Sequence, residues 1–251
     1  MTALYIITGA SRGLGRALAV QMAAEDRSLL TISRQPDPSL GTEAAQRGAT
    51  IEQWALDVAH DVGVAARLEA WLHHQDGKRF SAATLINNAG LLGGVGPLEQ
   101  MAAEDLAAVL RVNLEAPMAL TGAFLRGTQD WAAERKVLNI SSGAGRNPIA
   151  GWAAYCASKA GLDHFSRVTA LDEARKAHGA KIVSLAPGVI ETAMQAQLRA
   201  ADPKGFPDQQ RFVDLHANAQ LASPEAAAAK IVAYLARPDL GATPVSDVRS
   251  A

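Results

Sequence analysis

Three side chains in the second half of the chain have the types and spacing needed to protonate an alkoxide. Tyr155 and Lys159 stand four residues apart in Y-C-A-S-K, and Ser142 precedes them in N-I-S-S-G-A-G. A helix over 153–175 would place the phenol and the ammonium on one face. A cation beside the phenol favours phenolate, so we expect the pKa of Tyr155 to fall below its usual value near ~10. With Ser142 donating a hydrogen bond to a carbonyl oxygen, the pattern predicts acid–base chemistry at a carbonyl group.

A glycine-rich turn, T-G-A-S-R-G-L-G, follows the first apolar segment and opens into a helical pattern. Its glycines allow a tight turn, and the helix N-terminus behind them offers free N–H groups and a positive dipole. The spacing differs from the common G-x-G-x-x-G, and a turn without a ligand is the alternative. The turn predicts a pyrophosphate site. Its residues are Gly9, Ser11, Arg12, Gly13, Leu14 and Gly15.

The end of the second apolar segment indicates which dinucleotide would bind. This segment ends T-I-S-R, with Ser33 and Arg34 and no acid before Asp37. A carboxylate at this place would accept hydrogen bonds from a ribose 2′-OH, whereas arginines suit a 2′-phosphate. Arg12 is a second cation within reach, although both arginines could simply be solvated. The sequence therefore predicts NADP(H) as the cofactor.

Three later segments also follow candidate strands, where ligands bind in open parallel sheets. Asp57 and Val58 in L-D-V would hold the adenine, or Asp57 would cap the following helix instead. N-N-A-G would let the ribose and nicotinamide lie against the backbone, and A-P-G-V-I-E-T would grip the carboxamide. The contacts predicted in these last two segments are Asn88, Ala89, Gly90, Pro187, Gly188, Val189, Ile190 and Thr192.

Short apolar runs alternate with helix-period segments nearly to the end of the chain. Strands are expected at 3–8, 28–33, 50–55, 82–87, 136–141 and 181–185. Helices are expected at 13–25, 42–47, 62–75, 103–126, 153–176 and 224–236. This alternation predicts a Rossmann-type doubly wound parallel sheet in a three-layer α/β/α arrangement. Stretches 91–97 and 190–219 resist assignment, and loops of such length are usually functional.

Composition narrows the classes of partner. The chain has 251 residues, is 49% hydrophobic and carries a formal net charge of -1, so neither nucleic acid nor a membrane is an expected partner. One cysteine, Cys156, and an opening that runs straight into a strand pattern predict a cytoplasmic protein. The six histidines show no metal-ligand spacing, and we expect no metal site. No linker or repeat is evident, which predicts one domain over 1–251 with a substrate lid at about 190–220.

Together these motifs resemble the short-chain dehydrogenase/reductase family over essentially the full length. T-G-A-S-R-G-L-G, N-N-A-G, Asn113, Ser142, Y-C-A-S-K and P-G-V-I-E-T occur in the family's order. The second half most resembles the sepiapterin reductase and benzil reductase branch. The resemblance implies that Tyr155 is the general acid/base, that Lys159 lowers its pKa and bonds the nicotinamide ribose, and that Ser142 orients the carbonyl. It also implies that Asn113 anchors a water in a proton relay.

The substrate pocket is expected between 91–97, 144–152 and the segment after Thr192. An apolar lining favours a bulky or aromatic ketone or diketone, and its predicted residues are Leu91, Ile149, Trp152, Met194 and Leu198. The leading hypothesis is an NADPH-dependent carbonyl reductase acting on a small-molecule carbonyl substrate. The alternatives are a non-catalytic NADP(H) sensor and an alcohol dehydrogenase working in the oxidative direction. The alanine-rich helices 103–126 and 153–176 predict a homo-oligomer. The last residues differ from the glycine-rich tail frequent in tetrameric members of the family that the chain resembles, which leaves both a dimer and a tetramer open.

Overall fold

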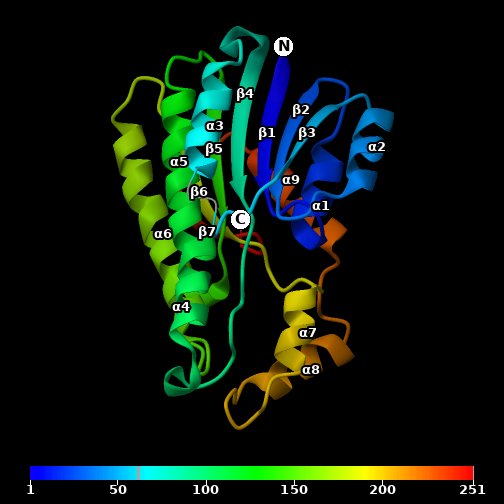
Figure 1. Cartoon of the computed structure of the whole chain (residues 1–251), viewed down its shortest axis with the longest axis vertical. Helices are drawn as coiled ribbons and strands as arrows, with labels where there is room; N and C mark the ends of the chain where they lie inside the picture. The colour runs from blue at the N-terminus through cyan, green and yellow to red at the C-terminus, as the bar shows by residue number, and fades with distance from the viewer. Residues whose placement is uncertain (61–62, 251) are drawn as a thin grey trace.

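A computed structural model describes residues 1–60 and 63–250 of the chain. These residues form a seven-stranded sheet in which every pair is parallel, in the order β3-β2-β1-β4-β5-β6-β7 (Figure 1). The strands are β1 (Thr2–Thr8), β2 (Arg27–Ser33), β3 (Thr50–Ala55), β4 (Phe80–Asn87), β5 (Glu134–Ile140), β6 (Lys181–Ala186) and β7 (Val245–Asp247). The doubly wound fold expected from the sequence is confirmed.

The first six strands lie within two residues of their expected bounds, whereas β7 was not predicted. Five of the six, β1, β2, β4, β5 and β6, are buried along most of their length, which is typical of strands covered on both faces. β3 lies at the sheet edge and alternates exposed with half-buried residues, apart from the buried Trp54. β7 has three residues, Val245–Asp247, and all three are half-buried, so no apolar run marks it. It pairs with Ser184–Ala186 at the sheet edge. Its position is therefore set by contact with β6 rather than by its own pattern.

Helices cover both faces of the sheet. Those on one face are α1 (Gly13–Met22), α2 (Pro38–Gln46) and α9 (Pro224–Leu235). Those on the other are α3 (Val64–His73), α4 (Ala103–Leu110), α5 (Ala116–Gly127) and α6 (Ala153–Ala174). α7 (Ala193–Arg199) and α8 (Gln209–Ala217) lie beyond the end of the sheet to which the strand arrows point (Figure 1).

Three helical expectations need correction. The predicted helix 103–126 is interrupted by a π-helical turn, η3 (Arg111–Glu115), between α4 and α5. Pro117, at the second position of α5, has no N–H to offer the carbonyl of Asn113, which opposes a regular α-helix there. α2 starts at Pro38, with Asp37 as its cap, rather than at residue 42. Segment 190–219 holds α7 and α8, and the expected start of α3 at Val62 lies outside the described residues.

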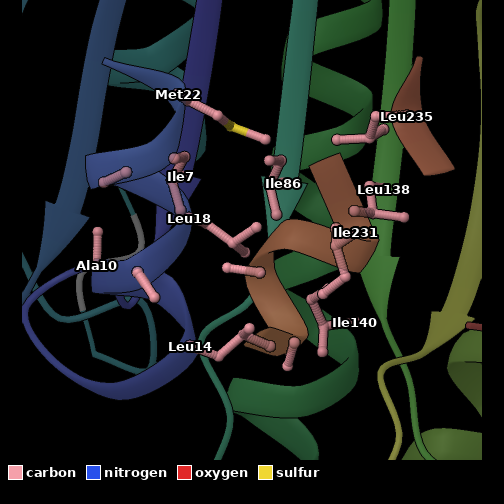
Figure 2. Packing of buried hydrophobic residues seen from close by; sticks show 14 of the residues in the cluster. Ile7, Ala10, Leu14, Leu18, Met22, Ile86, Leu138, Ile140, Ile231 and Leu235 are labelled. Carbon is pink, nitrogen blue, oxygen red and sulfur yellow. The ribbon is translucent and has the colours of Figure 1, made fainter. Parts of the chain in front are cut away.

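Two apolar clusters flank the sheet because side chains alternate along each strand. In β1, Leu4 and Ile6 face the cluster under α3 and α5, whereas Ile7 faces the cluster under α1 and α9. Figure 2 shows the second of these, where Leu18 of α1 points toward Ile86 and Ile231 of α9 lies beside Ile140. These side chains are buried. Burying each stabilises the fold by about 1.5–3 kcal/mol.

β1 pairs with β2 on one side and β4 on the other, so the direction of strand succession reverses between β1 and β4. A crevice forms at such a reversal, outside the carboxyl ends of the strands, and ligands bind there in open α/β sheets. The glycine-rich turn after β1 and the N-N-A-G turn after β4 both open into this crevice. The fold therefore brings together the two turns that the sequence assigned to the cofactor.

Candidate active site

The turns after β1 and β4 are tied together by side-chain hydrogen bonds. The hydroxyl of Thr8 accepts from the N–H groups of Asn88 and Ala89, both at 3.0 Å. The amide of Asn88 donates back to the carbonyls of Thr8 (2.9 Å) and Gly9 (3.2 Å). The backbones at this end of the sheet are thus held at fixed separation. Thr8 had not been predicted as part of the site.

Two glycines of the turn are required by this close approach. Gly9 has φ +68°, and a Cβ there would lie 2.9 Å from the Cα of Ala89. A Cβ on Gly15 would lie 2.2 Å from the carbonyl oxygen of Gly9 and 2.4 Å from the side-chain nitrogen of Asn88. A Cβ on Gly13 would make only an ordinary contact, 3.8 Å from the side chain of Thr192, although its φ of +55° still favours glycine. Gly9 and Gly15 therefore have a structural reason to be glycine that holds with or without a ligand.

The N-terminus of α1 suits an anion. Arg12 occupies the cap position but makes no side-chain cap hydrogen bond, and the first turn holds no acidic residue. The first N–H groups of a helix lack intrahelical partners and carry the positive end of its dipole. Ser11, Gly13 and Leu14 surround this end. Within the described chain, the α1 N-terminus thus fits a phosphate-bearing ligand.

The carboxyl end of β2 fits a second phosphate. Ser33 is buried, and within the described residues its hydroxyl has no hydrogen-bond partner. Arg12 and Arg34 are exposed, and among the ion pairs of the described chain neither takes part in one. Asp37 is engaged elsewhere: its carboxylate accepts from Arg16 at 2.7 Å, and that hydrogen bond lowers its pKa. Within the described residues, Arg12 and Arg34 therefore have no carboxylate partner that would compete with a phosphate for their guanidinium groups.

The structure gives Asp57 a turn role. Its carboxylate accepts from the N–H of Ala59 at 2.9 Å. This bond closes a local turn, whereas the cap position of α3 is Gly63, so the bond does not make Asp57 the cap of that helix, and the adenine contact of Asp57 stays a prediction. Val58 is half-buried against the cluster under α3.

Ser142, Tyr155 and Lys159 come together as expected. Ser142 follows β5 and starts the short helix η4 (Gly143–Gly145), where its hydroxyl accepts from the N–H of Ala144 at 3.2 Å. Tyr155 lies in the first turn of α6, is 8% exposed and shares a side-chain hydrogen bond with Ser142. The ammonium of Lys159 donates to the carbonyl of Ile140 at 2.8 Å. Packing of α6 on η4 and β6 thus assembles these groups at the end of β5.

The expected lowering of the tyrosine pKa is wrong for this structure. Burial raises the pKa of Tyr155 to about 12, and the hydrogen bond with Ser142 opposes this only in part. The ammonium of Lys159 lies 5.8 Å from the centre of the Tyr155 ring, and its bond goes to a backbone carbonyl. Burial also lowers the pKa of Lys159 from 10.5 to about 8, while the carboxylate of Asp163 raises it. Desolvation outweighs the charge pairing on which the expectation was based.

Asn113 lies in the π turn and is fully buried. Its carboxamide bonds both backbone groups of Leu91, accepting from the N–H and donating to the carbonyl, each at 2.8 Å. It also donates to the hydroxyl of Ser158 at 3.1 Å. Both amide hydrogens of Asn113 are therefore engaged, and the side chain joins the turn after β4 to α6. Its implied role in a water relay stays a prediction.

An aromatic cluster covers Tyr155. Trp152 lies 5.2 Å from Tyr155 between ring centres, and stacks on Phe206 at 5.4 Å. Phe212 completes the group at 5.6 Å from Trp152. The indole N–H of Trp152 is buried and, within the described residues, has no hydrogen-bond partner. Phe206 had not been predicted, since it stands between two prolines and outside any periodic run.

The other predicted pocket residues differ in how far their side chains are exposed to solvent. Leu198 is 1% exposed and belongs to the aromatic cluster, with Ile149 and Met194 packed against it. Leu91 is 37% exposed and its backbone is held by Asn113. The structure therefore places these residues around Tyr155, with Leu91 at the outer rim.

The segment after β6 is fastened to α7 and α8. Gly188 turns with φ +84°, and Ile190 pairs with Ala222. Glu191 accepts from Arg199 at 2.8 Å and contacts His216 at 3.1 Å. These links join both helices to the turn 187–192, which holds Pro187, Val189 and Thr192. α7 also reaches the loop after β4, because Gln197 donates to the carbonyl of Gly93 at 2.9 Å.

Across residues 1–60 and 63–250, no group of three histidine, cysteine or acidic side chains could hold a metal ion. In the same residues, no helix is both long and apolar enough to cross a bilayer.

A dinucleotide crevice beside a Ser–Tyr–Lys group defines the class of nicotinamide-dependent oxidoreductases. A model of the short chain dehydrogenase family matches residues 3–203, and the chain belongs to that family.

Individual proteins that are similar to this chain agree with this family assignment. The benzil reductase ((S)-benzoin forming) of Bacillus cereus is 38% identical over 220 residues, which is 88% of each chain. The sepiapterin reductase of Rattus norvegicus is 32% identical over 248 residues, covering 94% of this chain and 92% of that one. The solved structure of 3-oxoacyl-[acyl-carrier protein] reductase from Brucella melitensis in complex with NAD has a TM-score of 0.80 at 23% identity, over 99% and 96% of the chains. The chain is therefore similar to the branch indicated by its sequence.

Proposed function

We propose that this protein is an NADPH-dependent carbonyl reductase that reduces a ketone or diketone, with Tyr155 as the proton donor. The bound cofactor would supply the hydride. The observation that carries the proposal is the hydrogen-bonded pair of Ser142 and Tyr155, buried beside Lys159 at the end of β5. Such fixed donors stabilise negative charge as it develops on a carbonyl oxygen.

The high pKa of Tyr155 is compatible with this role. A pKa of about 12 keeps the phenol protonated at neutral pH, so a proton is available. An alkoxide is a far stronger base than a phenolate, so transfer from the phenol remains downhill. Lys159 has three ammonium hydrogens and spends one on Ile140, which leaves two for the cofactor ribose and the tyrosinate. Ser142 would hold the carbonyl oxygen from the opposite side.

The choice of NADPH over NADH rests on the end of β2. Arg12, Arg34 and the unpartnered hydroxyl of Ser33 offer donors for a 2′-phosphate, and Asp37 is held by Arg16. A 2′-phosphate accepts charge-assisted bonds from guanidinium groups. The similar fold from Brucella melitensis is a complex with NAD, so the fold alone does not select the cofactor. The residues of this chain favour the phosphorylated form.

The substrate class follows from the aromatic cluster around Tyr155. Trp152, Phe206 and Phe212 present ring faces, and the unpartnered indole N–H offers one donor. Apolar pockets with few polar groups bind bulky hydrophobic ligands. The name of the benzil reductase relative agrees with an aryl diketone. Tyr155 is 8% exposed, so we propose that the segment at about 190–220 acts as a lid that opens to admit this substrate.

We also propose that copies of the chain associate through α4, α5 and α6 in the cytoplasm. Leu110 and Met118 are exposed along an apolar groove of α4 and α5, and Val168 and Leu171 are exposed on α6. Exposed apolar side chains in such number mark an interaction face. A two-fold axis would pair this face with itself. The single cysteine suits a reducing compartment.

The experiment that tests the proposed function follows the absorbance of reduced nicotinamide with benzil, sepiapterin and simple aryl ketones. Each substrate is tried with NADPH and with NADH. We expect turnover of an aryl diketone with NADPH at a higher kcat/KM than with NADH. Binding of NADPH without oxidation on the whole panel would contradict the proposed activity, and equal use of NADH would contradict the cofactor assignment.

A further inference from the structure

A buried carboxylate stands behind the proposed catalytic group. Asp163 lies on α6, four residues after Lys159 and eight after Tyr155, and is 1% exposed. One of its oxygens accepts from the hydroxyls of Ser141 and Ser184, both at 2.6 Å. Ser141 precedes Ser142 at the end of β5, and Ser184 belongs to β6. A single oxygen atom therefore connects α6 to the two strands that carry the site.

The second oxygen of Asp163 is bonded less fully. It is buried and has no hydrogen-bond partner within the described residues, although the guanidinium of Arg146 approaches to 3.4 Å. Arg146 follows η4, in the loop begun by Ser142, and donates to the carbonyl of Ser246 in β7 at 3.0 Å. The negative charge of Asp163 thus faces the loop of Ser142 as well as the helix of Lys159.

The hydrogen bonds alone do not explain a charge at this position. Two serine hydroxyls can donate equally well to a neutral carboxamide, whereas burying an ion costs several kcal/mol before pairing. The guanidinium of Arg146 lies 3.4 Å from the carboxylate of Asp163, and the charge of Asp163 acts on Lys159 by raising its pKa. A buried lysine loses its proton readily, and an opposite charge close by opposes this loss.

We propose that Asp163 is a positioning residue that keeps Lys159 in its ammonium form and fixes the end of β5 that carries Ser142. The inference rests on the proposed function, because Lys159 and Ser142 have their roles there. According to this proposal, the hydrogen bonds of Asp163 are not sufficient, and its negative charge is required to keep Lys159 protonated.

The elements packed against Lys159 bring few other charges. Arg146 comes from the loop after η4 and lies between Asp163 and Asp247, whose pKa it helps to lower. Asp247 of β7 is itself paired with Arg249 at 2.7 Å. On the π turn, Arg111 and Glu115 are exposed. Among the described residues, the negative charge of Asp163 is the one that raises the pKa of Lys159.

The test is the titration of Lys159 itself, followed by NMR of protein labelled at the lysine side-chain carbons. The resonance of Lys159 is assigned as the one lost in Lys159→Arg. Asp163→Asn removes the charge and keeps an acceptor for both serines, and Ser184→Ala removes one hydrogen bond and keeps the charge. We expect the midpoint of Lys159 to fall by about one pH unit in Asp163→Asn and to stay in place in Ser184→Ala.

An unchanged midpoint in Asp163→Asn, with circular dichroism showing a folded protein, would overturn the proposal. If Asp163→Asn does not fold, the titration of Lys159 in Arg146→Gln tests the proposal instead, since this variant leaves the buried carboxylate of Asp163 intact. Loss of this competing cation should raise the Lys159 midpoint, and no shift would overturn the proposal. The titration needs no turnover: an inactive wild type would refute the proposed function and leave this result readable.

Discussion

The ammonium of Lys159 lies 5.8 Å from the centre of the Tyr155 ring and bonds the backbone carbonyl of Ile140, not the phenol oxygen. Lysine and tyrosine thus share a helix face, as their spacing required, without forming a direct bond. Burial is the largest cause of the raised pKa of Tyr155, and the hydrogen bond with Ser142 opposes it.

Removing the phenol hydroxyl tests the proton donor. Tyr155→Phe should keep NADPH binding and lose at least ~100-fold in kcat, the lower end of a general-acid contribution. NADPH binding is measured by fluorescence and turnover by nicotinamide absorbance. Tyr234→Phe, an equally buried tyrosine on α9, is the control and should turn over normally. A near-normal rate in Tyr155→Phe would exclude the mechanism.

Arginine at the end of β2 should discriminate between the two cofactors. Losing a charge-assisted bond of about 1.5–3 kcal/mol in Arg34→Ala should raise the KM for NADPH roughly 10- to 100-fold and leave that for NADH unchanged. Steady-state kinetics with both cofactors measure the difference. Arg47→Ala, at the far end of α2, is the matched control. A parallel rise for NADH would show that Arg34 does not read the 2′-phosphate.

A methyl group on Gly15 should destabilise the fold itself. The added Cβ would lie 2.2 Å from the carbonyl oxygen of Gly9, so the backbone must shift. We expect Gly15→Ala to lower the free energy of unfolding by about 1–3 kcal/mol, as overpacking does, measured by urea denaturation without cofactor. Gly63→Ala, where a Cβ meets open space, should change it by no more than about 0.5 kcal/mol. Equal stability of the two variants would contradict the close packing.

The buried lysine should make stability depend on pH in one window. The pKa of Lys159 is lowered from 10.5 to about 8 on folding, so between these values the unfolded chain binds more protons. Stability conferred by the neutral lysine is present above pH 10.5 and lost as pH falls towards 8. Relative to Lys159→Met, the wild type should gain on the order of 3 kcal/mol across the window. Urea denaturation at several pH values measures this, with exposed Lys230→Met as control, and a flat difference would contradict the burial effect.

A charge on the apolar face of α5 should disrupt self-association. Met118→Glu would place a carboxylate beside Leu110 in the groove of α4 and α5. We expect a lower oligomer mass by light scattering after gel filtration, with a folded protomer by circular dichroism. Leu98→Glu, also exposed but outside these helices, should keep the mass of the wild type. A monomeric wild type would contradict the proposed interface.

Much of the fold could be predicted because local pattern and tertiary environment agree. The strands β1, β2, β4, β5 and β6 are rich in apolar residues and mostly buried, and β3 shows the alternation of an edge strand. The glycine-rich turn could be predicted as well, because its closely packed positions leave no room for a Cβ. β7 could not be found, since three half-buried residues carry no pattern. α7 and α8 were missed because Pro203 and Pro207 interrupt a mixed sequence whose helices depend on the aromatic cluster.

The site likewise contains residues that could be predicted from the sequence and residues that could not. Ser142, Tyr155 and Lys159 were recognisable because their spacing is local to one helix and the strand end before it. Asp163 continues the face of Tyr155 and Lys159 at a spacing of four, a signal that was available and not used. Phe206 could not be predicted as part of the site from the sequence, because its partner Trp152 lies more than 50 residues away in the chain. The pKa of Tyr155 was misjudged since burial cannot be read from spacing.

The hydrogen bonds that the Thr8 hydroxyl accepts from the turn of Asn88 have a thermodynamic consequence. The two backbone turns that would flank a dinucleotide are already locked to each other in the protein alone, so little conformational entropy is left to lose there. The helices that cover the substrate side are held mainly by side-chain contacts such as that of Glu191 with Arg199. Calorimetry should therefore find a smaller entropic penalty for the cofactor, which binds between preformed turns, than for the ketone, whose binding requires α7 and α8 to move and then become ordered again.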